Sequence, residues 1–233
     1  MKILTVVMFC LALITCPFVY AQTTWDLAKD LGQAPNQISF DQGSNQTWYF
    51  MESASRVHDP TQYHFMSQYL QPCQSSGSGD TVIGVGCWHG TESKFLDLRL
   101  TPEIAFNFTN DLLDAKEEAY VGYQPRAMLI TASWERFAMV AWRSPITGAV
   151  MINGEFGWRN FFNAVAVTWT VDKGSSTLKS GTLYGGGFKG PVNIGRLPVS
   201  KGDVLYFIVD DYNDESCYCA KPVDFRIAIT QVQ

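Results

Sequence analysis

Residues 137–156 have the sequence FAMVAWRSPITGAVMINGEF, and this stretch decides the fold class. Two runs with the alternating pattern of β-strands flank a short segment that holds Pro145 and Gly148. Proline suits the second position of a turn because its φ is already fixed, and glycine can adopt the positive φ with which a chain re-enters a strand. We therefore predict a β-hairpin here and an all-β chain.

Strand signals recur along the chain, separated by turn residues. The spacing predicts antiparallel sheets packed as a β-sandwich, with at most one or two short helices, of which Asn110–Tyr120 is the best candidate and Thr61–Leu70 a second one. The expected strands are Gln46–Met51, Thr81–Trp88, Phe95–Leu100, Ala127–Ser133, Ala138–Arg143, Ala149–Asn153, Ala164–Val171, Val192–Leu197, Val204–Asp210 and Phe225–Val232.

The N-terminus has the pattern of a secretory signal peptide. Lys2 precedes an apolar run from Ile3 to Leu13, and Val19-Tyr20-Ala21 places small residues where a signal peptidase cuts. The run is shorter than the ~20 apolar residues that a transmembrane helix needs. We expect residues 1–21 to be removed and residues 22–233 to form a single secreted domain.

The charge pattern excludes two classes of partner. The chain has 17 Lys and Arg against 22 Asp and Glu, and the basic residues are scattered singly. Nucleic acid and anionic membranes attract clustered basic residues, so neither is an expected partner.

Four cysteines remain after signal cleavage, which predicts two disulfides in an oxidising compartment. Cys73 and Cys87 flank a Ser/Gly-rich loop at residues 75–80 and are the expected first pair. Cys217 and Cys219 are the expected second pair, but two residues of extended chain span ~6.6 Å, so this bridge requires a turn. Pairing between the two sets and zinc binding are the alternatives.

Three motifs resemble a class of secreted jelly-roll domains that occur in bacteria as appendages of extracellular proteins and are often compared with carbohydrate-binding modules. They are DQGSNQTWYF at 41–50, WxSPxxGxVxIxG at 142–154 and KGDVLYFxVD at 201–210. The resemblance covers most of the mature chain and implies a jelly-roll β-sandwich in an extracellular location, with no catalytic residues to transfer. The chain departs from the pattern at residues 73–87 and 110–120.

Two sequons begin at Asn45 and Asn107. Both would carry glycans in a secreted protein of a eukaryotic host, which would also fit a structural protein of an extracellular or skeletal matrix.

The residues that suggest metal binding do so weakly. His58, His64 and His89 match no metal-binding spacing. Asp210, Asp211 and Asp214 follow a core strand and could offer oxygen ligands to calcium, but the EF-hand order is missing and a solvated acidic turn is the favoured interpretation. We expect no cofactor.

No nucleophile elbow, phosphate-binding loop or dinucleotide motif is present in the sequence, so no catalytic residue is predicted. A polysaccharide-active enzyme stays open as an alternative through Glu103, Glu135 and Glu155, which flank strands beside aromatic residues.

The segment Trp158–Asn163 is the predicted binding site. It places aromatic rings and hydrogen-bonding side chains together on what we expect to be a loop carried by rigid strands, and its proposed ligand-contacting residues are Trp158, Arg159, Asn160, Phe161 and Asn163. We interpret the chain as a secreted, non-catalytic protein that binds extracellular glycans or matrix components.

Overall fold

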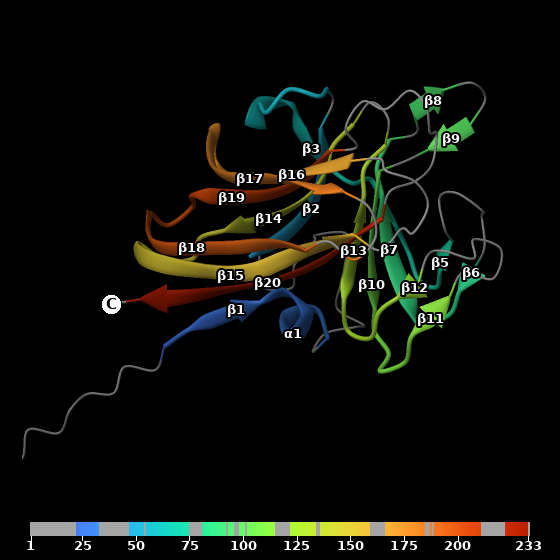
Figure 1. Cartoon of the computed structure of the whole chain (residues 1–233), viewed down its shortest axis with the longest axis horizontal. Helices are drawn as coiled ribbons and strands as arrows, with labels where there is room; N and C mark the ends of the chain where they lie inside the picture. The colour runs from blue at the N-terminus through green and yellow to red at the C-terminus, as the bar shows by residue number, and fades with distance from the viewer. Residues whose placement is uncertain are drawn as a thin grey trace, which may run out of the picture.

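The computed structural model describes residues 22–32, 47–53, 55–74, 81–91, 93–95, 98–100, 102–114, 122–133, 136–158, 166–184, 187, 189–210 and 222–232. Within these residues two antiparallel sheets lie face to face, as Figure 1 shows for β19 and β14 above β15 and β20. Sheet A has eight strands and sheet B has six. The predicted all-β sandwich is confirmed.

Eight consecutive strands form the centre of the sandwich. They pair as nested partners: β13 with β20 and β15 with β18 in sheet A, β14 with β19 and β16 with β17 in sheet B. This nesting is the arrangement of a jelly roll, in which one long hairpin is wound into two sheets. The strands are β13 (Met128–Thr131), β14 (Ala138–Arg143), β15 (Gly148–Trp158), β16 (Ala166–Lys173), β17 (Ser176–Tyr184), β18 (Lys189–Val199), β19 (Val204–Asp210) and β20 (Val223–Val232).

Earlier segments of the chain extend both sheets. Sheet A continues from β13 through β10 (Glu103–Asn107), β7 (Val85–His89) and β4 (Gln68–Leu70), and β1 (Thr24–Asp26) pairs with β20. Sheet B continues from β14 through β2 (Trp48–Ser53) and β3 (Tyr63–Phe65). Three small ribbons complete the strands: β5 (Cys73–Gln74) with β6 (Thr81–Val82), β8 (Ser93–Phe95) with β9 (Leu98–Leu100), and β11 (Leu113–Asp114) with β12 (Gly122–Tyr123).

The predicted hairpin at residues 137–156 is wrong. The turn at 144–147 exists, but it carries the chain from β14 in sheet B to β15 in sheet A, so the two strands have different partners. Ser144 holds this arch, because its backbone N–H donates to the Asp203 carbonyl and its carbonyl accepts from the Gly202 N–H. Gly148 does not adopt a positive φ. A strand with one apolar face buries that face equally well whether the next strand pairs with it or crosses to the opposite sheet. The alternating pattern therefore does not distinguish the two arrangements.

The turn at residues 172–176 does form a hairpin, between β16 and β17. Lys173 lies opposite Ser176, and Gly174 has a φ of +58° at the first central position. That position of a two-residue turn favours glycine.

Helices are as scarce among the described residues as expected, but only two residues of the proposed helices, Thr61 and Gln62, lie in one. They are α1 (Leu27–Gly32) and the 3₁₀ turn η1 (Pro60–Gln62). The proposed helix at Thr61–Leu70 is instead mainly β3 and β4, and the one at Asn110–Tyr120 contains β11, with residues 115–120 outside the described part. In these segments the backbone pairs with a neighbouring strand, β3 with β2, β4 with β7 and β11 with β12, and a short helix without tertiary packing cannot compete with this pairing.

The main core lies between the sheets and is rich in aromatic rings. Phe50 of sheet B packs on Trp88 of sheet A with ring centroids 4.1 Å apart, and Phe156 of sheet A stacks on Trp169 of sheet B at 5.1 Å. All four side chains are buried. These rings supply much of the apolar area that holds the sheets together, because each large ring buries far more surface than an aliphatic side chain.

Candidate functional site

The predicted binding segment lies almost wholly outside the described residues. Arg159, Asn160, Phe161 and Asn163 fall there, and Trp158 is the last residue of β15. Its backbone is in register with Val223 of β20. The start of the segment is therefore strand rather than the loop that we expected.

An aromatic patch lies on the outer face of sheet B, at the edge where β2 meets β3. We call Tyr49, Met51 and Phe65 the edge patch. Phe65 is 57% exposed, and its ring lies 5.6 Å from that of Tyr49 at an interplanar angle of 31°. Met51 lies directly opposite Phe65 in the register of the two strands. Three apolar side chains thus share one partly open surface on a rigid scaffold.

A polar side chain stands near the edge patch. Arg143 is exposed at the end of β14, next to the fully buried Trp142, so it leaves the sheet on the outer face. Ala141, two residues before it on the same face, is opposite Tyr49 in the register. Arg143 therefore shares the outer face with the edge patch, but its guanidinium lies on the β19 side of β14, 4.0 Å from the position of a Cβ atom at Gly202.

Another part of the outer face of sheet B is covered by residues 55–63, which we call the strap. Tyr63 packs edge-on against Tyr206 with ring centroids 4.9 Å apart, and His58 packs edge-on against Phe137 at the same distance. Arg56 forms an ion pair with Asp210. The strap thus closes a small second core on this face and leaves the edge patch beside it.

A buried ion pair anchors the strap. His58 Nδ1 lies 2.7 Å from Oδ2 of Asp172, whose side chain is 0% exposed, while the His58 side chain stays 32% exposed. The hydrogen bond to Asp172 raises the pKa of His58 above its usual value, against the opposing effect of burial. Burial raises the pKa of Tyr63, and the nearby Asp172 charge adds to this effect. The strap is therefore held most tightly when His58 is protonated.

Asp210 is not available as the calcium ligand that we considered. Its carboxylate is paired with the Arg56 guanidinium, and a bound cation would have to displace that charge. Asp211 and Asp214 lie outside the described residues.

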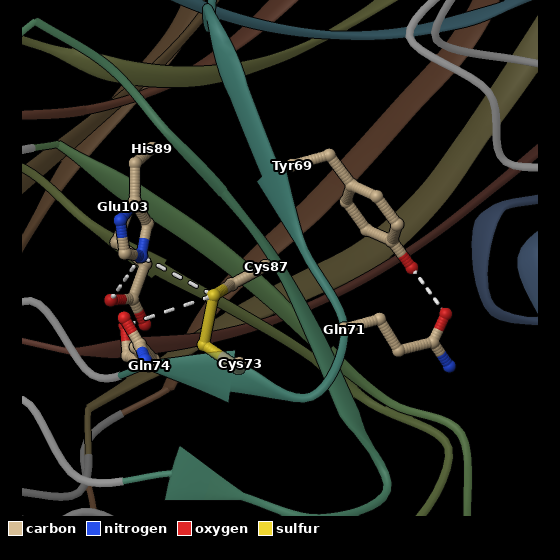
Figure 2. Close-up of a disulfide and its surroundings, with 7 residues drawn as sticks. All are labelled: Tyr69, Gln71, Cys73, Gln74, Cys87, His89 and Glu103. Carbon is tan, nitrogen blue, oxygen red and sulfur yellow. Dashed lines mark hydrogen bonds and ion pairs between the residues drawn. A yellow bond between two sulfur atoms is a disulfide. The ribbon is translucent and has the colours of Figure 1, made fainter.

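The predicted disulfide between Cys73 and Cys87 is confirmed. Figure 2 shows that it is surrounded by further side chains with metal-binding atoms, His89 and Glu103. His89 Nε2 lies 3.3 Å from Cys87 Sγ and 3.2 Å from Glu103 Oε2. Cys217 and Cys219, the proposed second pair, lie outside the described residues.

The three histidines do not converge on one site. Among the described residues, the one group of metal-binding side chains that gathers is Cys73, Cys87, His89 and Glu103, all of them buried. Sequence reasoning missed this group. The Cys-x-His spacing of Cys87 and His89 was the available signal, since residues two apart on a strand face the same side.

The structure describes the asparagine of only one of the two sequons. Asn45 lies outside the described residues. Asn107 is buried, and its side-chain amide donates to the carbonyls of Asp111 and Tyr123, both at 2.8 Å. A glycan on this nitrogen would have to replace one of those protons inside the fold, so the structure argues against glycosylation of Asn107.

No family model matches the sequence, and no curated protein sequence matches it. Solved structures with a similar arrangement include CBM51 from Clostridium perfringens GH95 in complex with methyl-galactose, at 13% identity over 52% of this chain and 79% of that chain, with a TM-score of 0.34. The family 11 carbohydrate-binding module of cellulosomal cellulase Lic26A-Cel5E of Clostridium thermocellum matches at 9% identity over 71% and 94% of the two chains, with a TM-score of 0.30. A structure of infectious bursal disease virus, Gt strain, matches at 8% identity over 79% and 50%, with a TM-score of 0.29.

At these scores we infer nothing about this chain from the similar structures. The jelly-roll assignment rests on the nested strand pairing alone. No helix among the described residues has both the length and the apolar character needed to cross a bilayer.

Proposed function

We propose that this protein is a secreted, non-catalytic glycan-binding β-sandwich that uses the edge patch of sheet B to contact sugar. The observation that carries the proposal is the pair of rings, Tyr49 and Phe65, that lie side by side on the outer face of sheet B with Phe65 more than half exposed. A pyranose ring has one face of C–H groups and a rim of hydroxyls. The C–H face packs against an aromatic ring, whose face carries partial negative charge.

The geometry of the edge patch suits this kind of contact. Met51 lies opposite Met139 on β14 as well as opposite Phe65 on β3, so β2, in the middle of the patch, has a hydrogen-bonded strand on each side. Sites on strands are more rigid than sites on loops, which lowers the ordering cost of binding.

Exposure of Phe65 also needs an explanation of its own. A single exposed apolar residue is ordinary, but a ring more than half exposed, beside a second ring and a methionine, is a continuous apolar surface. Such surfaces on soluble proteins commonly mark binding sites. Secretion supports an extracellular partner, and it rests on the signal peptide predicted at residues 1–21.

The test is a binding measurement on Phe65→Ala. A glycan array identifies the best ligand for the mature protein, and isothermal titration then compares wild type with the variant. We expect the affinity of Phe65→Ala to fall by more than about 1 kcal/mol, roughly fivefold or more, as for other aromatic anchors. The melting temperature should change little, because the ring is mostly exposed.

Tyr184→Ala is the matched control. Tyr184 is 59% exposed on β17, at the opposite edge of the same sheet. Its loss should leave glycan affinity unchanged. Equal affinities for wild type and Phe65→Ala, or an equal loss in Tyr184→Ala, would contradict the proposed site, and an array without any glycan signal would contradict the proposed function.

We further propose that the segment from Trp158 to Asn163 contributes a second contact. Trp158→Ala should then weaken glycan binding by more than about 1 kcal/mol and leave the melting temperature nearly unchanged. A loss of ~3–5 kcal/mol in stability, the usual cost of deleting a core ring, would instead identify Trp158 as a core residue and remove the segment from the site.

A further inference from the structure

We propose that Cys73, Cys87, His89 and Glu103 form a zinc site when their disulfide is reduced. In the oxidised protein a covalent bond ties β5 to β7. In the reduced protein a tetrahedral Zn²⁺ ion would tie the same two strands through the two thiolates, the imidazole and the carboxylate.

The fold already brings the four donors together. Cys87 and His89 leave β7 on the same face, and Glu103 of β10 lies directly opposite His89 in the register of the sheet. Cys73 comes from β5, which lies against this face (Figure 2). One donor atom from each of the four residues lies within 4.8 Å of all the others.

The distances match those between ligands of one metal ion. With Zn–N of about 2.0 Å and Zn–S of about 2.3 Å, tetrahedral geometry places neighbouring ligand atoms about 3.3–3.8 Å apart. His89 Nε2 lies 3.3 Å from Cys87 Sγ and 3.2 Å from Glu103 Oε2. The two sulfur atoms, which are bonded to each other in the oxidised state, must separate, and donor pairs as far apart as 4.8 Å must approach by about 1 Å to reach the tetrahedral spacing.

The type of donor selects the metal. Two thiolates and an imidazole favour zinc or another thiophilic ion over calcium and magnesium, which prefer oxygen donors. All four residues are buried. Burial without a cation would leave two thiolates and a carboxylate close together in a poorly solvated space, so Zn²⁺ offsets a charge that the fold would otherwise have to protonate.

The exchange balances with a dithiol as the reductant. The dithiol gives two electrons to the protein disulfide and becomes a disulfide itself, and its two protons are released. The two protein sulfurs leave the reaction as thiolates bound to Zn²⁺. β5 is thus tied to β7 in both states, by the disulfide or by the zinc ion.

The experiment measures zinc in the full-length mature protein. The protein is incubated with ZnSO₄, with and without dithiothreitol, desalted without oxygen and analysed for metal by mass spectrometry. Cobalt(II) replaces zinc in a parallel sample, because tetrahedral thiolate-bound cobalt has intense visible bands that surface-bound cobalt lacks. We expect one equivalent of metal in the reduced protein and none in the oxidised protein.

Two ligand variants and one control decide the site. His89→Gln and Glu103→Gln should each lower zinc affinity of the reduced protein by at least roughly 10- to 100-fold, the effect of losing even an outer partner of a ligand. His64→Gln replaces an exposed histidine on β3 and should bind zinc as the wild type does. Wild-type affinity in His89→Gln, or equal uptake by the oxidised protein, would overturn the proposal.

Loss of the disulfide could unfold the protein, so the thermal unfolding of the reduced protein is followed with and without zinc. Zinc should raise the melting temperature, or restore the folded circular dichroism spectrum if the metal-free reduced chain is unfolded, because metal binding is coupled to folding at such sites. A reduced chain whose spectrum and melting temperature do not respond to zinc would overturn the proposal.

Discussion

Gly190→Ala should destabilise the sandwich, because the Trp169 ring occupies the space of the new methyl group. A Cβ atom built at Gly190 on β18 would lie 2.3 Å from Trp169 Nε1 and 2.7 Å from its Cε2. Ordinary contacts of this kind begin near 3.4 Å, so the ring would have to retreat by about 1 Å. Its retreat is blocked, since it is stacked on Phe156 and rests against Gly181.

The expected cost lies at the upper end of the range for overpacked cores, about 2–3 kcal/mol, because the ring is held on several sides. For a domain of this size each kcal/mol lowers the melting temperature by about 2–4 °C, so we expect a drop of about 4–12 °C. Urea unfolding followed by tryptophan fluorescence gives the free energy, and calorimetry gives the melting temperature.

Gly195→Ala on the same strand is the matched control. A Cβ atom at Gly195 meets no atom within 4 Å, and the residue has no positive φ, so this variant should be neutral or slightly stabilised. If the two variants differ by less than about 0.5 kcal/mol, the Trp169 contact does not constrain Gly190 and the argument from packing fails.

Three further predictions concern the bridge, the strap and the buried amide. The double variant Cys73→Ser/Cys87→Ser should lose about 3 kcal/mol of stability in urea, the value expected for a loop closed by cysteines 14 residues apart. The pKa of His58 is raised in the folded protein. The contribution of His58 to stability is therefore complete at a pH below its ordinary pKa of 6.5 and is lost as the pH rises through the higher pKa of the folded state. The difference in the free energy of unfolding between wild type and His58→Gln should shrink from pH 6 to pH 9. A gap that widens over this range would contradict the proposed anchoring by Asp172. Asn107→Ala should cost about 2–4 kcal/mol through its lost hydrogen bonds, and glycopeptide mapping after expression in a glycosylating host should find Asn107 unmodified.

Local sequence patterns predicted strands well and their partners poorly. The alternation in 138–143 and 149–153 identifies β14 and β15, because alternation reports burial of one face of a strand. Alternation does not show which strand pairs with which, and the turn between β14 and β15 joins two different sheets. The nearly continuous apolar run at 204–209 is buried on both faces, whereas 166–173 alternates between buried and half-exposed residues.

The sites were harder to predict than the fold. The bridge between Cys73 and Cys87 was predictable because it closes a local loop. Glu103 comes next to His89 only through the pairing of β10 with β7, and this long-range contact leaves no trace in the local sequence. The side chain of Phe65 is exposed because it lies on an edge strand. Nothing in the local sequence shows that this strand is at the edge of a sheet.

The nested pairing of the central strands also sets the order in which the chain can fold. Of the four nested pairs, only β16 and β17, at the centre of the nest, are joined by a short turn, whereas Met128 of β13 must find Phe225 of β20 almost a hundred residues away. Such distant contacts have a high entropic cost and slow folding. During synthesis, sheet A therefore stays incomplete until residues 223–232 have left the ribosome. Until then the edge of β15 that β20 will cover is open to other chains, so removal of the last strand should cause aggregation rather than yield a smaller folded domain.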